Sequence, residues 1–201
     1  MRKEVNYLGI IGPLVALTCI GIAILLSPWF TWTGNALSDL GRYGNGLPAA
    51  VVFNAGLVTT ALLMLVYVYF LILDGKDKWT KLGFVPLVVA LVFLALIGVF
   101  SEDFGVIHFY VSVGFFASFP WSMWMTGFVR VLLHRVRDLF AVVSLILPFL
   151  SVYMWGGWYG GLFPTLTGNA IPEITTALSA IGWTWSIWFL RSKGELAEAF
   201  N

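Results

Sequence analysis

Residues 49–73 read AAVVFNAGLVTTALLMLVYVYFLIL, a stretch of 25 residues with no Asp, Glu, Lys, Arg or His. A helix of about 20 apolar residues is long enough to cross the hydrocarbon core of a bilayer. Because hydrocarbon offers no partner to free backbone N–H and C=O groups, only helices and closed β-barrels span membranes. A barrel strand has about 10 residues that alternate between apolar and polar positions, unlike this stretch. The stretch therefore predicts a transmembrane helix.

Five further segments share this character, and none contains a charged residue or a histidine: 7–27, 83–100, 109–129, 139–155 and 174–190. Of all residues 60% are hydrophobic and 10% are charged, whereas a soluble domain carries roughly 25% charged residues. The sequence thus predicts an all-α, polytopic membrane protein, a single transmembrane domain over residues 1–201 built as a six-helix bundle. The net charge of +1 argues against nucleic acid as a partner, and the single Cys19 excludes a disulfide framework.

The basic residues predict the orientation of this bundle. Ten of the eleven Lys and Arg residues fall on one side of the predicted membrane: Arg2, Lys3, Lys76, Lys78, Lys81, Arg130, Arg135, Arg137, Arg191 and Lys193. Only Arg42 falls on the other side. Cytoplasmic loops carry the excess of Lys and Arg, so both termini are expected in the cytoplasm of a multi-pass cell-membrane protein.

Three loops, 27–47, 101–108 and 156–173, lie on the predicted outer side. They carry four acids, one histidine and the single outer arginine: Asp39, Glu102, Asp103, Glu173, His108 and Arg42. Because short loops hold helix ends together, we expect these groups to meet in one outward-facing pocket. The glycine-rich loop 156–173 suits a lid, although the sequence does not decide this point.

Two carboxylates and a histidine are the minimal set for a divalent metal or for acid–base catalysis. Asp39, Glu102 and His108 are therefore the candidate catalytic residues and the candidate ligands of a metal, with Ser38 as a further catalytic candidate. Asn35, Arg42, Asp103 and Glu173 are candidates for binding substrate, Arg42 through a phosphate group.

Each of these residues also has a structural interpretation. Glu102 and Asp103 are then solvated loop acids, and Glu173 complements the dipole of a first helical turn. Asn35 and Ser38 stabilise a turn, Asp39 pairs locally with Arg42, and His108 is an interfacial side chain. No established metalloprotease or serine-hydrolase motif accompanies them, so the sequence leaves both interpretations open.

The same residues resemble a known family. NALSDLG at residues 35–41, GVFSE at residues 98–102, His108, and the Pro172-Glu173 pair are similar to the pattern of the prokaryotic membrane family called domain of unknown function 998. That family more often has Phe-Pro-Glu where this chain has Ser101 before Glu102. The resemblance implies a six-helix bundle in which the following residues form one site: Asn35, Ser38, Asp39, Glu102, His108 and Glu173. It implies no reaction.

Three functions remain in view. The first is a lipid-active hydrolase or remodelling enzyme with a polar site at the outer leaflet. The layout is also similar, at the level of the fold, to eukaryotic membrane proteins that remodel lipid anchors. The second is a non-enzymatic protein that binds a lipid or a small molecule. A transporter ranks third, because transporters usually carry ionisable residues at mid-membrane and these segments have none. Membrane lipids are the expected partners, and assembly into a homo-oligomer stays open.

Overall fold

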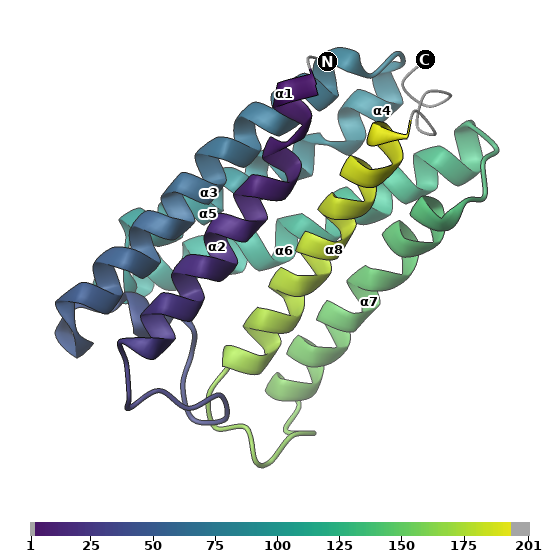
Figure 1. Ribbon diagram of the computed structural model, residues 1–201. Helices are drawn as coiled ribbons and strands as arrows, with labels where there is room; N and C mark the ends of the chain where they lie inside the picture. The colour runs from purple at the N-terminus through teal and green to yellow at the C-terminus, as the bar shows by residue number, and fades with distance from the viewer. Residues whose placement is uncertain (1–2, 194–201) are drawn as a thin grey trace.

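The computed structural model describes residues 3–193, and within them it contains helices and no strands. The α-helices are α1 Lys3–Asn6, α2 Leu8–Leu25, α3 Leu47–Asp74, α4 Lys78–Gly83, α5 Val85–Val99, α6 Val106–Phe128, α7 Leu139–Tyr159 and α8 Ala170–Ser192. A π-helical turn, Val129–Leu133, prolongs α6. Single residues separate α1 from α2 and α4 from α5, so the described chain forms six long rods (Figure 1). The predicted all-α bundle is confirmed.

Five of these rods are long and apolar enough to cross a membrane: Glu4–Leu25, Leu47–Asp74, Lys78–Val99, Val106–Leu133 and Leu139–Tyr159. The sixth rod, α8, has 23 residues and is more polar. Its polar side chains are buried against the other helices, as Thr176, Ser179 and Thr184 show. The helix is thus long enough to span a membrane, and its polar side chains face the interior of the bundle.

Helices that follow one another along the chain also pack side by side, from α2 through α3, α5, α6 and α7 to α8. Contacts between α8 and α2 then close the ring. Trp183 of α8 is fully buried, packs against Phe84, Phe119 and Phe140, and donates its indole N–H to the Ser144 hydroxyl (2.8 Å). This cluster fixes α8 against the junction of α4 and α5, against α6 and against α7.

The two ends of the bundle carry different residue types. The first and last described residues lie at one end together with the connections 75–77 and 134–138, and we call it the basic end. The acidic end consists of the connections 26–46, 100–105 and 160–169. Which end faces the cytoplasm stays a prediction.

Backbone contacts hold the long connections of the acidic end in place. Thr167 N and Gly168 N both donate to Thr33 O (2.9 Å each), and Ala170 N donates to Asn35 O (2.9 Å). A Cβ atom on Gly168 would lie 2.3 Å from the carbonyl oxygen of Asn35, so only glycine allows this approach. The connection 160–169 is therefore joined to the connection 26–46.

A buried amide then ties the first of these connections to the bundle. Asn54 of α3 donates from Nδ2 to Gly41 O at 2.8 Å. A Cβ atom on Gly41 would come within 2.5 Å of the Asn54 side chain. The segment 38–41 is therefore held tightly on α3 in a 3₁₀ turn, Ser38–Gly41.

Candidate active site

A cavity of about 750 Å³ opens at the acidic end, and we call it the wide cavity. Five of the residues predicted to form a site line it: Ser38, Arg42, Glu102, His108 and Glu173. One face of α6 forms a long wall from His108 to Trp124, which is about 24 Å at the rise of an α-helix. The opposite wall comes from α7, including Trp155 and Tyr159. Most of the charged groups thus sit at one end of an otherwise aromatic space.

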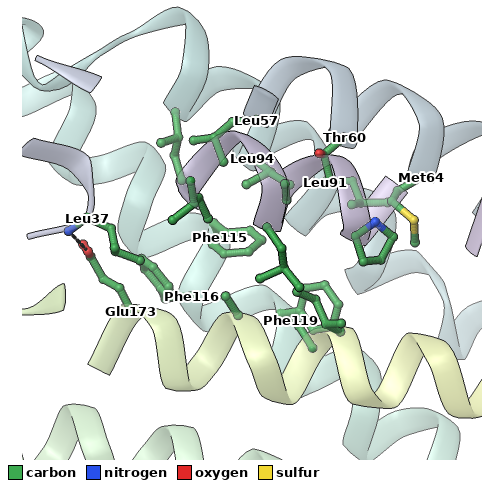
Figure 2. A pocket seen from close by; sticks show the side chains of 18 of the residues that line it. Leu37, Leu57, Thr60, Met64, Leu91, Leu94, Phe115, Phe116, Phe119 and Glu173 are labelled. Carbon is green, nitrogen blue, oxygen red and sulfur yellow. Dashed lines mark hydrogen bonds between the residues drawn. The ribbon is translucent and has the colours of Figure 1, made fainter. Parts of the chain in front are cut away.

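A second cavity of about 110 Å³ lies among α2, α3, α5, α6 and α8, and we call it the narrow cavity (Figure 2). Its wall is almost entirely apolar, with Leu91, Leu94 and Phe115 among its members. Four residues belong to both cavities: Ser38, Ser112, Phe116 and Glu173. The two cavities therefore adjoin at this set of residues.

Glu173 is buried at this junction, with 6% of its surface exposed. Its carboxylate Oε2 accepts a hydrogen bond from the Leu37 backbone N–H at 2.5 Å (Figure 2). The sequence predicts a role in substrate binding for Glu173. The structure gives its carboxylate a definite partner, which links α8 to the connection 26–46.

Glu102 and Asp39 form a carboxyl pair beside the wide cavity. Asp39 Oδ2 accepts from Asn35 Nδ2 (3.0 Å) and from Ala36 N (2.9 Å). Glu102 Oε2 is buried and has no hydrogen-bond partner among residues 3–193. Burial raises the pKa of Glu102 to about 7, and the neighbouring Asp39 carboxyl adds to the shift. The Glu102 carboxyl therefore holds its proton to a higher pH than an ordinary glutamate.

His108 opens α6, but its ring does not join the carboxyl pair. Nδ1 lies 2.7 Å from Phe100 O and Nε2 lies 3.3 Å from Ser112 Oγ. Within the described part of the chain, no three His, Cys, Asp or Glu side chains are grouped so that they could hold a metal ion. Asp39, Glu102 and His108 thus do not fit the metal site that the sequence suggests, because the histidine ring turns to another partner.

Asp103 and Asn35 lie outside the wall of the wide cavity. Asp103 Oδ2 accepts from Tyr43 N (2.8 Å) and Ser101 Oγ (2.9 Å), and the Tyr43 N–H is the main cause that lowers the pKa of Asp103. Asn35 Oδ1 accepts from Thr31 N (2.9 Å). These contacts fold the connections of the acidic end, so both residues support the site rather than face its space.

The structure adds two details to the picture drawn from the sequence. Ser112 has no assigned role in the sequence, although its spacing of four residues from His108 puts the two side chains on one helix face. Helix α7 also runs to Tyr159, so Gly156 and Gly157 are helical and only 160–169 forms the connection. The connection is therefore shorter than the loop 156–173 expected from the sequence, and whether it acts as a lid stays open.

The comparisons with known proteins place the chain in a family. The family described as "Protein of unknown function (DUF998)" matches residues 10–192. No curated protein and no solved structure is significantly similar to the chain. The match includes all the residues of the acidic end described above and confirms the resemblance drawn from the sequence. The chain belongs to the DUF998 family of proteins of unknown function.

Proposed function

We propose that this protein is an enzyme that hydrolyses or remodels membrane lipids at the acidic end of its bundle. The observation that carries the proposal is the shape of the wide cavity, which joins a group of charged side chains to a long aromatic space. A lipid has the same division between a polar headgroup and apolar chains. Ligand sites combine apolar walls with a few convergent polar groups in this way.

The polar groups of the cavity suit chemistry on a headgroup. Glu102, with a pKa of about 7, can both give and take a proton at neutral pH, as general acid–base catalysis requires. Perturbed carboxyl groups in cavities are typical of active sites. Arg42 lines the same space and is half exposed, so its guanidinium is available to a phosphate.

A non-enzymatic lipid-binding protein is the second candidate. It is favoured by the structural partners of Asp39 and Asp103, because carboxylates held by backbone N–H groups support a fold without taking part in chemistry. The same cavity would then hold a lipid without turning it over.

The test is an assay of the purified protein in nanodiscs against phospholipid esters, lipid amides and lipid phosphates, with products identified by mass spectrometry. The enzyme proposal predicts turnover of one class, and predicts that Glu102→Gln and His108→Ala reduce it at least 100-fold while the melting temperature stays close to that of the wild type. A lipid that co-purifies stoichiometrically and stays unchanged in every assay would support the binding protein instead.

We also propose that the acidic end faces the cell exterior, in line with the ten basic residues of the other end. Gly44 and Lys76 are exposed at opposite ends of the bundle. In a Cys19→Ser background, a membrane-impermeant thiol reagent is expected to label Gly44→Cys and not Lys76→Cys in intact cells. The reverse pattern would contradict the orientation and place the site in the cytoplasm.

A further inference from the structure

Ser112 and His108 lie four residues apart on α6, and their side chains meet. Phe100 O lies 2.7 Å from His108 Nδ1, and a carbonyl oxygen can only accept a hydrogen bond. Nδ1 therefore carries the proton of the neutral ring, and Nε2 is left as the acceptor. Ser112 Oγ, at 3.3 Å, then donates its hydroxyl hydrogen to Nε2. A serine, a histidine base and a group that orients the base are the parts of an activated nucleophile.

Ser112 also lies where the two cavities meet. It belongs to the walls of both cavities, with polar groups on the side of the wide cavity and apolar groups on the side of the narrow one. Along α8 the narrow cavity extends from Glu173 to Thr184, which is about 16 Å at the helical rise.

The narrow cavity is itself unusual for a protein interior. Packed interiors leave few voids larger than a water molecule, and apolar voids of this size stay dry and accept apolar ligands. Figure 2 shows Leu57, Leu91 and Phe115 around this space, with Glu173 at one end and Met64 toward the other. A long, narrow, apolar space of this kind fits a single acyl chain better than a ring or a polar group.

From these observations we infer that Ser112 is the nucleophile of an acyl-transfer reaction on lipid esters, with His108 as its base. The acyl chain occupies the narrow cavity, and the alcohol part, which carries the headgroup, occupies the wide cavity. The inference rests on the proposed function and names its substrate class and its catalytic serine.

The reaction balances with these groups and water. Ser112 Oγ bonds to the acyl carbon while its proton passes to His108 Nε2. The ester C–O bond then breaks, and the departing alcohol oxygen takes that proton, which leaves an acyl-serine. Water attacks the acyl carbon and gives its proton to His108, which returns it to Ser112 Oγ as the fatty acid leaves. The Ser38 hydroxyl, which lines both cavities together with Ser112, is the neutral donor for the oxyanion.

The first test is covalent labelling. A fluorophosphonate probe should modify Ser112 of the wild type, as intact-mass and peptide mass spectrometry would show, and should not modify Ser112→Ala. His108→Ala should slow the labelling by about 100-fold or more. Ser118→Ala, on the same helix but outside both cavities, is the matched control and should label like the wild type.

The outcomes separate the two ideas. Lipid turnover by Ser112→Ala, or labelling of another residue instead, would overturn the nucleophile and leave the lipid-active enzyme standing. Labelling of Ser112 in a wild type that turns over no lipid would support the activated serine and contradict the proposed function.

The second test concerns the acyl chain. Ala177 lines the narrow cavity on α8, and Ala177→Phe should fill part of it. With p-nitrophenyl esters of increasing length, this variant should lose at least 10-fold in rate on long chains and keep its rate on acetate. Leu178→Phe, at an exposed neighbouring position, is the control and should keep the profile of the wild type. An unchanged profile for Ala177→Phe would overturn the placement of the chain.

Discussion

The acidic residues at the two ends of the bundle have different partners. At the basic end three acids each pair with a base: Asp74 with Arg191 at 2.6 Å, Asp77 with His134 at 3.0 Å, and Asp138 with Arg130. The acidic end carries four acids and one arginine: Asp39, Glu102, Asp103, Glu173 and Arg42. Of these acids, only Asp103 lies within 4 Å of the arginine in the described chain. The three pairs hold helix ends together at the basic end, whereas Glu102 Oε2 at the acidic end is buried without a hydrogen-bond partner among residues 3–193. Buried, perturbed carboxyls of this kind are typical of functional sites.

The pKa values show the same contrast. At the basic end burial opposes ionisation of Asp77, but hydrogen bonds from Thr80, Trp79 and His134 outweigh it and lower the pKa of Asp77 to about 2. At the acidic end burial raises the pKa of Glu102 to about 7, and the charge of Arg42 opposes the shift without cancelling it. Asp77 at the basic end therefore keeps its charge, whereas the carboxyl of Glu102 at the acidic end holds its proton to a higher pH than an ordinary glutamate.

The largest expected effect comes from breaking a pair at the basic end. Arg130 has only 5% of its side chain exposed and binds Asp138 through two of its nitrogens. Asp138→Asn should lower the free energy of unfolding by about 3 kcal/mol, because it leaves a buried cation unpaired. Asparagine keeps the N-cap of α7, so the change isolates the charge. Thermal melts in detergent should show a much larger loss for this variant than for Glu102→Gln, and equal losses would remove the contrast between the ends.

A glycine at the acidic end gives the next effect. Gly168→Ala should cost about 1–3 kcal/mol, since a methyl group would collide with the Asn35 backbone. Gly182→Ala, in the middle of α8 with open space around it, is the matched control and should be neutral or stabilising. If both variants melt at the same temperature, the connections 26–46 and 160–169 are not joined as described.

The pH dependence of stability should distinguish the ends by sign. Folding raises the pKa of Glu102 from its ordinary 4.5 to about 7, so protonated Glu102 adds to the free energy of unfolding. This added stability is fully present below about pH 4.5 and is lost as the pH rises through 7. Relative to Glu102→Gln, the wild type should therefore lose melting temperature between pH 5 and 8, by about 3 °C or less for a partly exposed group. Asp77 has the opposite sign, because its pKa is lowered on folding. The stability that ionised Asp77 adds is lost only as the pH falls below about 4 toward 2. Scanning fluorimetry across pH 3–8 measures both.

Arg42→Ala should have the smallest effect on stability, less than about 1 kcal/mol. Its guanidinium is 52% exposed and lies 3.9 Å from Asp103, so water screens the pair. The variant should instead bind anionic lipid more weakly than the wild type in a flotation assay with vesicles containing phosphatidylglycerol. A large drop in melting temperature would assign Arg42 to the fold rather than to the site.

The fold could be predicted from the sequence because each transmembrane helix needs its own uncharged run, and such runs are readable one at a time. The arrangement of the site could not be predicted in the same way, because it depends on the orientation of the histidine ring and of the carboxylate groups. The His108 ring contacts Phe100 O, a carbonyl left without a helical partner where α5 ends, rather than Glu102, six residues before it. Ser112 looked ordinary because hydroxyl groups in helices usually bond to their own backbone.

The bond between Leu37 N and Glu173 Oε2 joins residues 136 positions apart, and this separation governs when the site is completed. A ribosome that adds about 5–20 residues per second reaches Glu173 about 7–27 s after Leu37. During that interval the segment with Ser38 and Arg42 lacks its anchor on α8. Chains released before α8 is made would insert the preceding helices yet carry no finished cavity, so the site forms only once α8 has been synthesised.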